Sequence, residues 1–274
     1  MATKTTPNSP AGWRPDVTAY LPSEVVPGAL ILQTANVVGA IEGDEPAVRV
    51  PYVVSDGTIG FVAEGAEIAD ANQSFAETVI TTDKVAALGK YSYETLAQPQ
   101  AAQMVVDSLS RGVIAKANQA YLGNASNPTG LLNVAGITDG GAVGDDLDAI
   151  VDAVAGIEAD GGGATHIIAA PSAWAALSKL KTATGSAQNL LGAGTAAGER
   201  SILGVPVLVT SAMPADGLIV LDKNAVLAAQ SQVRLARSED AYFSSDVVAV
   251  RVTWRLGWTV MHPARVAKLT TDTP

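Results

Sequence analysis

Residue types that commonly catalyse reactions or hold metals are scarce in this chain. Its 274 residues include only two histidines, His166 and His262, and no cysteine. Neither histidine has the HExxH spacing or another spacing typical of metal ligands, and the lack of cysteine excludes disulfides, thiolate catalysis and cysteine-based metal sites. We therefore expect both histidines to be structural, and we expect no metal site.

A serine nucleophile and a phosphate-binding loop are also poorly supported. The sequence has no GxSxG motif, and Ser172 follows Pro171 where we expect a helix to start. Gly192, Gly194 and Gly198 depart from the GxGxxG spacing and lack a strand, turn and helix around them. These glycines therefore indicate a mobile loop rather than a nucleotide site.

The remaining candidate groups are acidic or aromatic. Asp145, Asp146 and Asp148 lack the EF-hand spacing and its terminal glutamate, so we expect them to stabilise a helix N-terminus. Trp254 and Trp258 could stack on a ligand, but two tryptophans on the apolar face of a regular strand are expected in the core. The chain is thus expected not to be an enzyme and to need no cofactor. A cytosolic hydrolase with scattered catalytic residues is the alternative from another class.

The composition indicates surface that is shared between subunits. Hydrophobic residues make up 48% of the chain and charged residues 16%, against roughly a quarter charged in ordinary globular proteins. With so few charges, the apolar area must lie inside an unusually large core or against neighbouring molecules. Large subunit interfaces are the usual solution, because exposed apolar patches aggregate.

The charge balance disfavours direct nucleic-acid binding. The chain has 17 basic and 27 acidic residues, a net charge of −10, which disfavours contacts to phosphates. Residues 1–199 carry 9 basic and 21 acidic groups (9 − 21 = −12), whereas residues 200–274 carry 8 and 6 (8 − 6 = +2). Halves of opposite sign suit head-to-tail association, although chance surface composition explains the difference equally well.

The first half of the chain alternates between extended and helical patterns. Its N-terminus is polar and proline-rich, and no later apolar run is long enough to span a bilayer, so we expect a soluble protein made in the cytoplasm. The extended runs between residues 47 and 93 predict a two-stranded ribbon, which is marginal in water and needs another surface to lie on. The expected elements are an extended arm (1–22), a short helix (23–41), a strand (47–54), a second extended run (59–63), a polar segment (64–74), a third extended run (75–93) and a long helix that has Pro99 at its first turn and ends at Gly123.

The pattern of apolar residues in the second half of the chain predicts a separate α/β unit followed by a long strand. After a loop at 124–144, a helix from Asp145 and Asp146 is expected to bury Leu147, Ile150, Val151, Val154 and Ile157. The remaining elements are a strand (166–170), a helix (171–182) with Trp174 and Leu177 inward, and strands at 202–210 and 217–221. In the final strand one face carries the apolar residues Val248, Val250, Val252, Trp254, Leu256, Trp258 and Val260.

This order of elements resembles the major capsid proteins of tailed phages with the Hong Kong 97-type fold. Five stretches carry the resemblance over about residues 20–270: FVAEGAEI (61–68), YSYETLAQP (91–99), AYLGNASNPTGLL (120–132), ILGVPVLVTSAMP (202–214) and VVAVRVTWRLGWTVMHPARVAKL (247–269). The resemblance implies an α+β fold. Its parts are an N-terminal arm and short helix (1–46), an E-loop (47–96), a P-domain spine helix and following loop (97–144), an A-domain (145–235) and P-domain closing strands (236–274).

The resemblance also implies a function, partners and contact residues. The chain would self-assemble into pentamers and hexamers of an icosahedral head shell that encloses double-stranded DNA without sequence-specific binding. An encapsulin-like bacterial nanocompartment is the alternative. The other implied partners are a portal and separate scaffold or decoration proteins, with no membrane. The candidate inter-subunit contacts are Ile59, Phe61, Glu64, Glu67 and Phe75 in the E-loop and Arg251, Trp254, Arg255 and Trp258 in the P-domain sheet.

Two departures from the family pattern limit what carries over. Some members join subunits through an isopeptide bond from an E-loop lysine, but no lysine lies between Glu45 and Asp83 here. We therefore do not expect covalent cross-links. Other members carry a long N-terminal scaffolding segment, whereas fewer than fifty residues precede the E-loop in this sequence. We expect any scaffold to be a separate protein.

Overall fold

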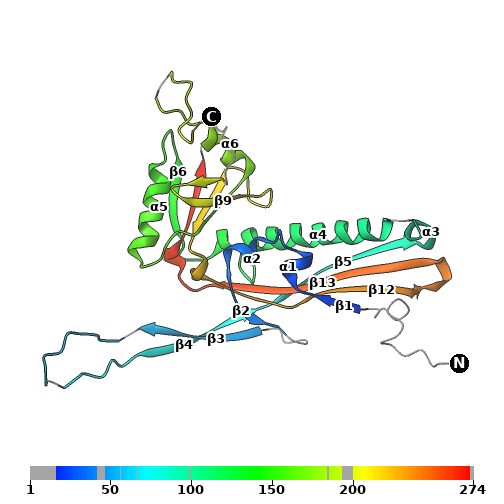
Figure 1. The fold of residues 1–274 in the computed structure, drawn as a ribbon, viewed down its shortest axis with the longest axis horizontal. Helices are drawn as coiled ribbons and strands as arrows, with labels where there is room; N and C mark the ends of the chain where they lie inside the picture. The colour runs from blue at the N-terminus through cyan, green and yellow to red at the C-terminus, as the bar shows by residue number, and fades with distance from the viewer. Residues whose placement is uncertain are drawn as a thin grey trace.

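The longest helix and the longest strand of the described chain lie side by side at the centre of the fold. In the computed structural model, α4 (Ala101–Gly123) runs along β13 (Val247–Val260) (Figure 1). The structure describes residues 17–41, 47–55, 57–65, 67–98, 100–183, 185–192 and 200–271. The expected helix is confirmed, while Pro99 and residues 1–16 of the expected arm lie outside the described residues.

The first sheet is built around β13. Strands β12 (Val233–Tyr242) and β11 (Val226–Gln230) both run antiparallel to it, and β5 (Asp83–Ser92) pairs antiparallel with Val247–Leu256. The sheet is completed by β1 (Val17–Tyr20), which pairs with β12, and by β2 (Asn36–Ala40), which runs parallel to β11. Residues far apart in the sequence thus meet in one sheet.

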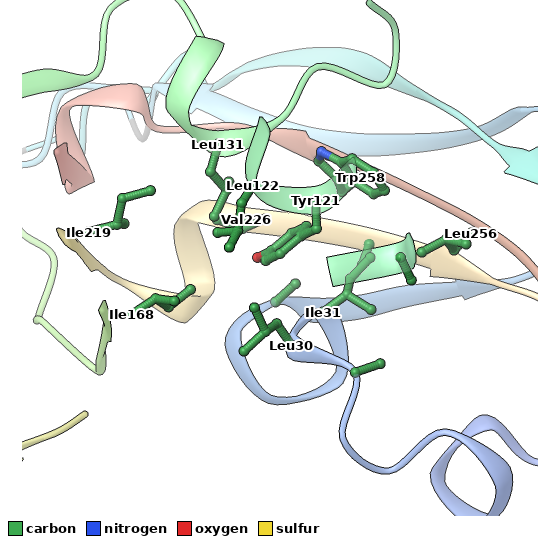
Figure 2. Packing of buried hydrophobic residues seen from close by; sticks show 14 of the residues in the cluster. Leu30, Ile31, Tyr121, Leu122, Leu131, Ile168, Ile219, Val226, Leu256 and Trp258 are labelled. Atoms are coloured by element: carbon green, nitrogen blue, oxygen red, sulfur yellow. The ribbon is translucent and has the colours of Figure 1, made fainter. Parts of the chain in front are cut away.

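One face of this sheet and the helix α4 form the main core. The predicted apolar face of β13 is confirmed from Val248 to Trp258, since its alternate residues are buried, whereas Val260 is half-buried. Of these side chains, Val252, Trp254, Leu256 and Trp258 pack in one cluster with Val113, Ala117 and Tyr121 of α4. Leu30 and Ile31 of the short helix α2 (Leu30–Thr34) close the core from the side (Figure 2).

The second sheet carries its own smaller core. Its order is β6 (Thr138–Val143), β14 (Val266–Thr271), β10 (Gly217–Leu221), β7 (His166–Ala169), β9 (Val205–Val209) and β8 (Ser201–Ile202). Helices α5 (Asp148–Ala159) and α6 (Pro171–Lys179) bury Ile150, Ile157 and Leu177 against it. The alternating α/β pattern predicted for this half is confirmed in β7, α6 and β10.

A two-stranded ribbon projects from the end of the molecule opposite the β12–β13 hairpin (Figure 1). Strands β3 (Ala47–Ser55) and β4 (Ser74–Thr81) pair antiparallel. Residues 57–73 connect them, and we call the described residues of this segment the projecting loop. Ile41, Ile80, Leu227 and Ala229 form a small third cluster at the ribbon base. The ribbon therefore joins the first sheet only at its base.

Short elements connect these parts. The chain enters the first sheet through α1 (Pro22–Val25), and α3 (Tyr93–Leu96) precedes α4. Four 3-10 turns complete the described chain: η2 (Leu131–Asn133), η3 (Lys223–Ala225), η4 (Phe243–Ser245) and η5 (Pro263–Arg265).

Several predicted elements differ from the structure. The helix expected at 23–41 is two short helices followed by the strand β2, and the loop expected at 124–144 contains the strand β6. The extended run at 59–63 forms no strand, and the run at 75–93 is two strands that belong to different sheets. Helix α5 begins at Asp148, and Val151 on it is exposed.

The closing strands also divide differently from the expected boundaries. β11 lies in the first sheet, although its residues fall in the range 145–235, and β14 lies in the second sheet, although its residues fall in 236–274. The turn η5 between β13 and β14 therefore carries the chain from one sheet to the other. Pairing with distant strands, which a local period does not reveal, decides both placements.

Candidate assembly surfaces

The projecting loop exposes large apolar side chains. Phe61 is fully exposed, and the exposed fractions of Ile59 and Ile68 are 83% and 80%. Phe75, at the start of β4, is also exposed. The loop has no core of its own, because its side chains from 57 to 70 are all exposed apart from the undescribed Ala66. Such a segment loses exposed apolar area only by contacting another surface.

The loop is also acidic. Glu64, Glu67 and Asp70 are exposed, and the sequence from 57 to 73 has no basic residue. Among the described residues none of these three carboxylates has an ion-pair partner within 4.0 Å. The predicted contact residues Ile59, Phe61, Glu64, Glu67 and Phe75 thus lie on one projection, available to a partner.

The ribbon is fixed to the sheet by a close backbone crossing. At Gly257 in β13 a Cβ atom would lie 2.9 Å from both the Thr81 carbonyl carbon and the Thr82 Cα. Only glycine leaves room there for the β4–β5 junction. Asn127 Nδ2 donates to Thr81 Oγ1 (3.0 Å), and Arg255 Nη1 donates to the Thr82 carbonyl (3.1 Å). These contacts set the direction in which the ribbon leaves the sheet.

The four contact residues predicted in the P-domain sheet lie on β13 of the first sheet and separate into two pairs. Trp254 and Trp258 are buried in the main core, as expected from the apolar face, and Trp258 Nε1 donates to the Thr129 carbonyl (2.7 Å). They support the sheet from inside the subunit and offer no surface to a neighbour. Arg251 is exposed and Arg255 half-buried on the opposite face. These two arginines therefore remain the candidate contacts.

Other residues that were not predicted as contacts lie on the same face of the sheet. The register of β5 with β13 places Lys84 beside Arg255 and Leu88 beside Arg251, and that of β12 places Arg234 beside Thr253. Lys84, Ala86, Leu88 and Lys90 alternate along one side of β5, which is a period-two signal. That alternation was visible in the sequence, but the partner strand was not.

The residues that could have done chemistry have structural roles. Ser172 Oγ accepts a hydrogen bond from the Asp216 amide (2.9 Å), and Asp146 Oδ1 accepts one from the Asp148 amide (3.2 Å) just before α5. The N-cap residue of α5 is Leu147, which makes no side-chain cap hydrogen bond, so Asp146 forms a turn before the helix instead of capping it. Gly192 lies in a loop with φ +90°, whereas Gly194 and Gly198 lie outside the described residues.

The two histidines lie in separate elements: His166 is the first residue of β7, and His262 directly precedes the turn η5. Burial, with a smaller contribution from nearby Lys223, lowers the pKa of His166 below its ordinary value. Its Nδ1 lies 3.1 Å from Thr165 Oγ1, a hydrogen bond between neighbouring residues. His262 is exposed. In the part of the chain that the structure describes, no three His, Asp or Glu side chains are grouped to hold a metal ion.

Among the described helices none combines the length and the apolar character needed to cross a bilayer. In the described part of the chain α4 is the longest helix, and its buried positions lie mainly in its second half.

Solved structures share this arrangement. A structure from Gordonia phage Cozz is 16% identical, with a TM-score of 0.71 over 96% of this chain and 89% of that chain. One from Mycobacterium phage Adephagia is 14% identical, with a TM-score of 0.71 over 100% and 99%. The capsid of a native GTA particle is 21% identical, with a TM-score of 0.65 over 89% and 90%. The expected Hong Kong 97-type capsid fold is confirmed.

The sequence itself gives the family. No curated protein sequence matches the chain. The model of the phage capsid family, in contrast, matches residues 25–271, which include every helix and strand described here except β1 and part of α1. The chain belongs to the phage capsid family.

Proposed function

We propose that copies of this chain form pentamers and hexamers that tile the icosahedral head shell of a phage around double-stranded DNA. As a phage capsid family member, the chain is the major shell-forming subunit. The projecting loop of one subunit lies over the first sheet and the long helix α4 of its neighbour. Each subunit thereby buries apolar area that it cannot hide alone.

The exposed apolar end of the ribbon is the observation that carries this proposal. Phe61, Ile59 and Ile68 lie on a segment that extends away from the body of the subunit (Figure 1). A free subunit with such a projection would associate nonspecifically, whereas a closed ring covers each loop with the next subunit. A contact between two different surfaces, repeated around an axis, generates rings.

Deleting residues Asp56–Asn72 tests the proposal. Because the loop contributes no residue to the three described cores, we expect a folded subunit with a normal circular-dichroism spectrum. We also expect it to form no closed shells in electron micrographs. Normal closed particles from this deletion would contradict the assignment of the loop.

A smaller change separates contact from chain length. Ile59→Ala, Phe61→Ala and Ile68→Ala together remove the apolar side chains and keep the loop. We expect this triple variant to lose most particles. Val151→Ala is the matched control, because Val151 is also an exposed apolar residue but lies on α5 of the second sheet. The control should assemble as the unaltered chain does.

The contents of the particle distinguish the two capsid functions. A phage shell made during infection contains DNA, whereas a nanocompartment shell contains a cargo enzyme. The similar structures reported above come from phages and a GTA particle, and they favour the phage shell. We propose that a portal and separate scaffold or decoration proteins are its other partners, and that the subunit is made in the host cytoplasm and ends in the virion.

A further inference from the structure

A groove runs along one side of the long helix α4. It lies between α1, α4 and the strand β12 (Figure 1) and has a volume of about 640 Å³. At a rise of about 1.5 Å per residue, the wall that α4 supplies is about 16 Å long, or roughly three helical turns. The residues of this wall are three or four positions apart and share one face of the helix: Gln103, Val106, Asp107, Ser110, Arg111 and Ile114.

The floor of the groove is apolar and has no open strand edge. Val233 of β12 and Val252 of β13 are buried in this floor, and Leu235 of β12 is half-buried beside them. β12 pairs with β1 on one side and with β13 on the other, and β13 pairs there with β12 and β5. An occupant of the groove therefore meets side chains and no free row of backbone groups.

The first half of α4 is poorly covered. The buried residues of this helix begin at Ser110. Before that position Val106 and Leu109 are only half-buried, and the exposed fraction of Met104 is 66%. A helix normally packs its apolar stripe against another surface. The groove therefore leaves apolar area of α4 and of the first sheet open to a partner.

The rim of the groove carries more negative than positive charge. Glu24 on α1 and Asp107 on α4 are exposed carboxylates, and Arg111 is the cation that lines the groove with them. Among the described residues none of these three has an ion-pair partner within 4.0 Å. Asp107 Oδ1 accepts a hydrogen bond from Gln103 Nε2 (2.8 Å). Basic side chains beside an apolar face would complement this rim.

We propose that the groove binds an amphipathic helix of a separate protein, with the apolar stripe of that helix on the floor and its basic residues beside Glu24 and Asp107. A helix pairs its own backbone groups, whereas an extended segment would leave them unpaired against a surface of side chains. A stripe that recurs every three or four residues also matches the three turns of the wall. This inference rests on the proposed shell function and names the surface at which the proposed separate scaffold protein binds.

A second copy of this chain fits the groove less well. Among the described helices, α5 exposes Asp148, Asp152 and Glu158, which would repel the acidic rim. The helix α6 exposes no large apolar side chain. The described residues of the projecting loop are also acidic and form no helix. A helix with an apolar stripe and basic residues beside it is thus absent from the described part of the chain, which favours a separate protein.

The size of the groove indicates a transient partner. A helix of about three turns is about 16 Å long, and its contact area falls below the range of about 1,200–2,000 Å² that is typical of stable interfaces. Contacts of this smaller size are weak and reversible. That property suits a scaffold that acts during assembly, whereas a permanent decoration protein needs a larger surface.

A synthetic peptide tests the site in the full chain. The probe is a fluorescent helical peptide of about four turns, with leucines three and four positions apart and lysines beside them. Fluorescence anisotropy of the peptide should show saturable binding to the subunit. Val106→Glu places a charge on the apolar wall and should raise the Kd at least about tenfold. Met104→Glu is the matched control, because Met104 is exposed on the same helix outside the groove, and it should change the Kd by less than about twofold.

Exchange of charge tests the rim. Glu24→Lys with Asp107→Lys should weaken binding of the lysine peptide at least about tenfold, and it should strengthen binding of a peptide with glutamates in place of the lysines. Asp152→Lys with Glu158→Lys is the matched control, because it changes the net charge by the same amount at exposed positions of α5. The control should change binding of either peptide by less than about twofold. Circular dichroism checks that each variant is folded.

A single introduced cysteine locates the bound peptide, because the chain has none of its own. Gln103→Cys lies on the wall of the groove, whereas Lys116→Cys lies on an exposed part of α4 outside it. A peptide that carries one cysteine should form a disulfide with the first variant and not with the second.

Several results would overturn the inference. They include equal peptide binding by Val106→Glu and Met104→Glu, binding that is insensitive to the exchange of charge, and equal disulfide formation at positions 103 and 116. Tighter binding to a chain without residues 1–16 would assign the groove to that segment instead. Loss of shells from Val106→Glu expressed alone, with normal shells from Met104→Glu, would assign it to a neighbouring copy.

Failure of the inference is distinguishable from failure of the proposed function. Closed shells from the unaltered chain without peptide binding would overturn the groove proposal and leave the shell function standing. Absence of shells from the unaltered chain would overturn the proposed function, whereas peptide binding is measured on the subunit itself. Electron microscopy and anisotropy therefore report on the two proposals separately.

Discussion

The rings of Tyr121 in α4 and Trp258 in β13 meet edge to face, with centroids 5.4 Å apart and planes at 83° (Figure 2). Both side chains are buried. The Tyr121 hydroxyl lies 3.1 Å from Thr34 Oγ1 of α2 in a hydrogen bond, and burial raises the pKa of Tyr121 above its ordinary value, so the hydroxyl keeps its proton. This contact joins the long helix, the closing strand and the short helix α2.

Substitutions of Tyr121 should separate its hydroxyl from its ring. Tyr121→Phe removes the bond to Thr34 and should lower the free energy of unfolding by about 1 kcal/mol. Tyr121→Ala also leaves a cavity against Trp258 and should cost about 3–5 kcal/mol. Urea unfolding of the unassembled, loop-deleted subunit measures both. The exposed Tyr93 is the control, because Tyr93→Phe should change stability by less than about 0.5 kcal/mol. Equal losses from Tyr121→Phe and Tyr121→Ala would contradict this division.

The crossing at Gly257 should tolerate no side chain. Gly257→Ala places a methyl group against the backbone of Thr81 and Thr82, so the β4–β5 junction must move, and we expect a loss of about 1–3 kcal/mol. Because this junction directs the ribbon, the yield of closed shells should fall as well. Gly156→Ala is the control: its Cβ meets nothing within 4 Å in α5, and it should stabilise the subunit by about 0.5–1 kcal/mol. Shells from Gly257→Ala in normal yield would show that the ribbon does not depend on this crossing.

Local periodicity was sufficient to predict the elements that bury one regular face of their own side chains. The helix α4 and the strand β13 each bury one regular face in the same core, so their apolar residues recur at 3.6 and 2 residues and both were predicted. The α5 start shifted to Asp148, since Asp146 forms a local turn before the helix. The sequence could therefore identify the elements that form the main core.

Elements held by distant pairing left no comparable pattern. β2 is mostly exposed and exists because it pairs with β11, about 190 residues away in the chain. β6 contains Gly140 and Gly141, which are typical of loops, yet a Cβ at Gly140 would lie 2.9 Å from Leu269 Cγ on the adjacent β14. Similarly, Lys84, Arg234 and Arg251 share one side of the first sheet because of the registers of three strands, so only the alternating residues of β5 could be recognised as one group beforehand.

The junction between the two sheets depends on Arg265. Its Nε donates to Asp160 Oδ2 (2.8 Å) and its Nη2 to the Asp160 carbonyl (2.7 Å), which ties η5 to the end of α5. Arg265→Lys keeps the charge but cannot make both bonds, and it should cost about 1–2 kcal/mol. The more exposed pair of Lys268 and Asp139, 3.0 Å apart, is the comparison, since solvent screens this pair and its removal should lower the free energy of unfolding less than Arg265→Lys does. Urea unfolding of Arg265→Lys and of a variant without the Lys268–Asp139 pair compares the two losses in free energy of unfolding. A larger loss from removing the exposed pair would contradict this prediction.

The lowered pKa of His166 predicts a pH dependence of stability. In the folded subunit, burial and then Lys223 disfavour the charged imidazole, so the unfolded chain binds the proton more readily. Stability from this group is therefore complete above the ordinary histidine pKa of about 6.5. It declines as the pH falls below that value and levels off below the folded pKa. Free energies of unfolding between about pH 5 and 8 should show this decline in the unassembled subunit.

His166→Gln should remove the part of this decline that belongs to histidine, because glutamine does not titrate. His262→Gln is the matched control: His262 is exposed, so its replacement should leave the decline in place. The carboxylates titrate at lower pH, with ordinary values of about 4, and their effect is separated from that of His166 by comparing the variants rather than by the slope alone. An unchanged pH profile in His166→Gln would mean that the imidazole at the start of β7 does not control stability in this range.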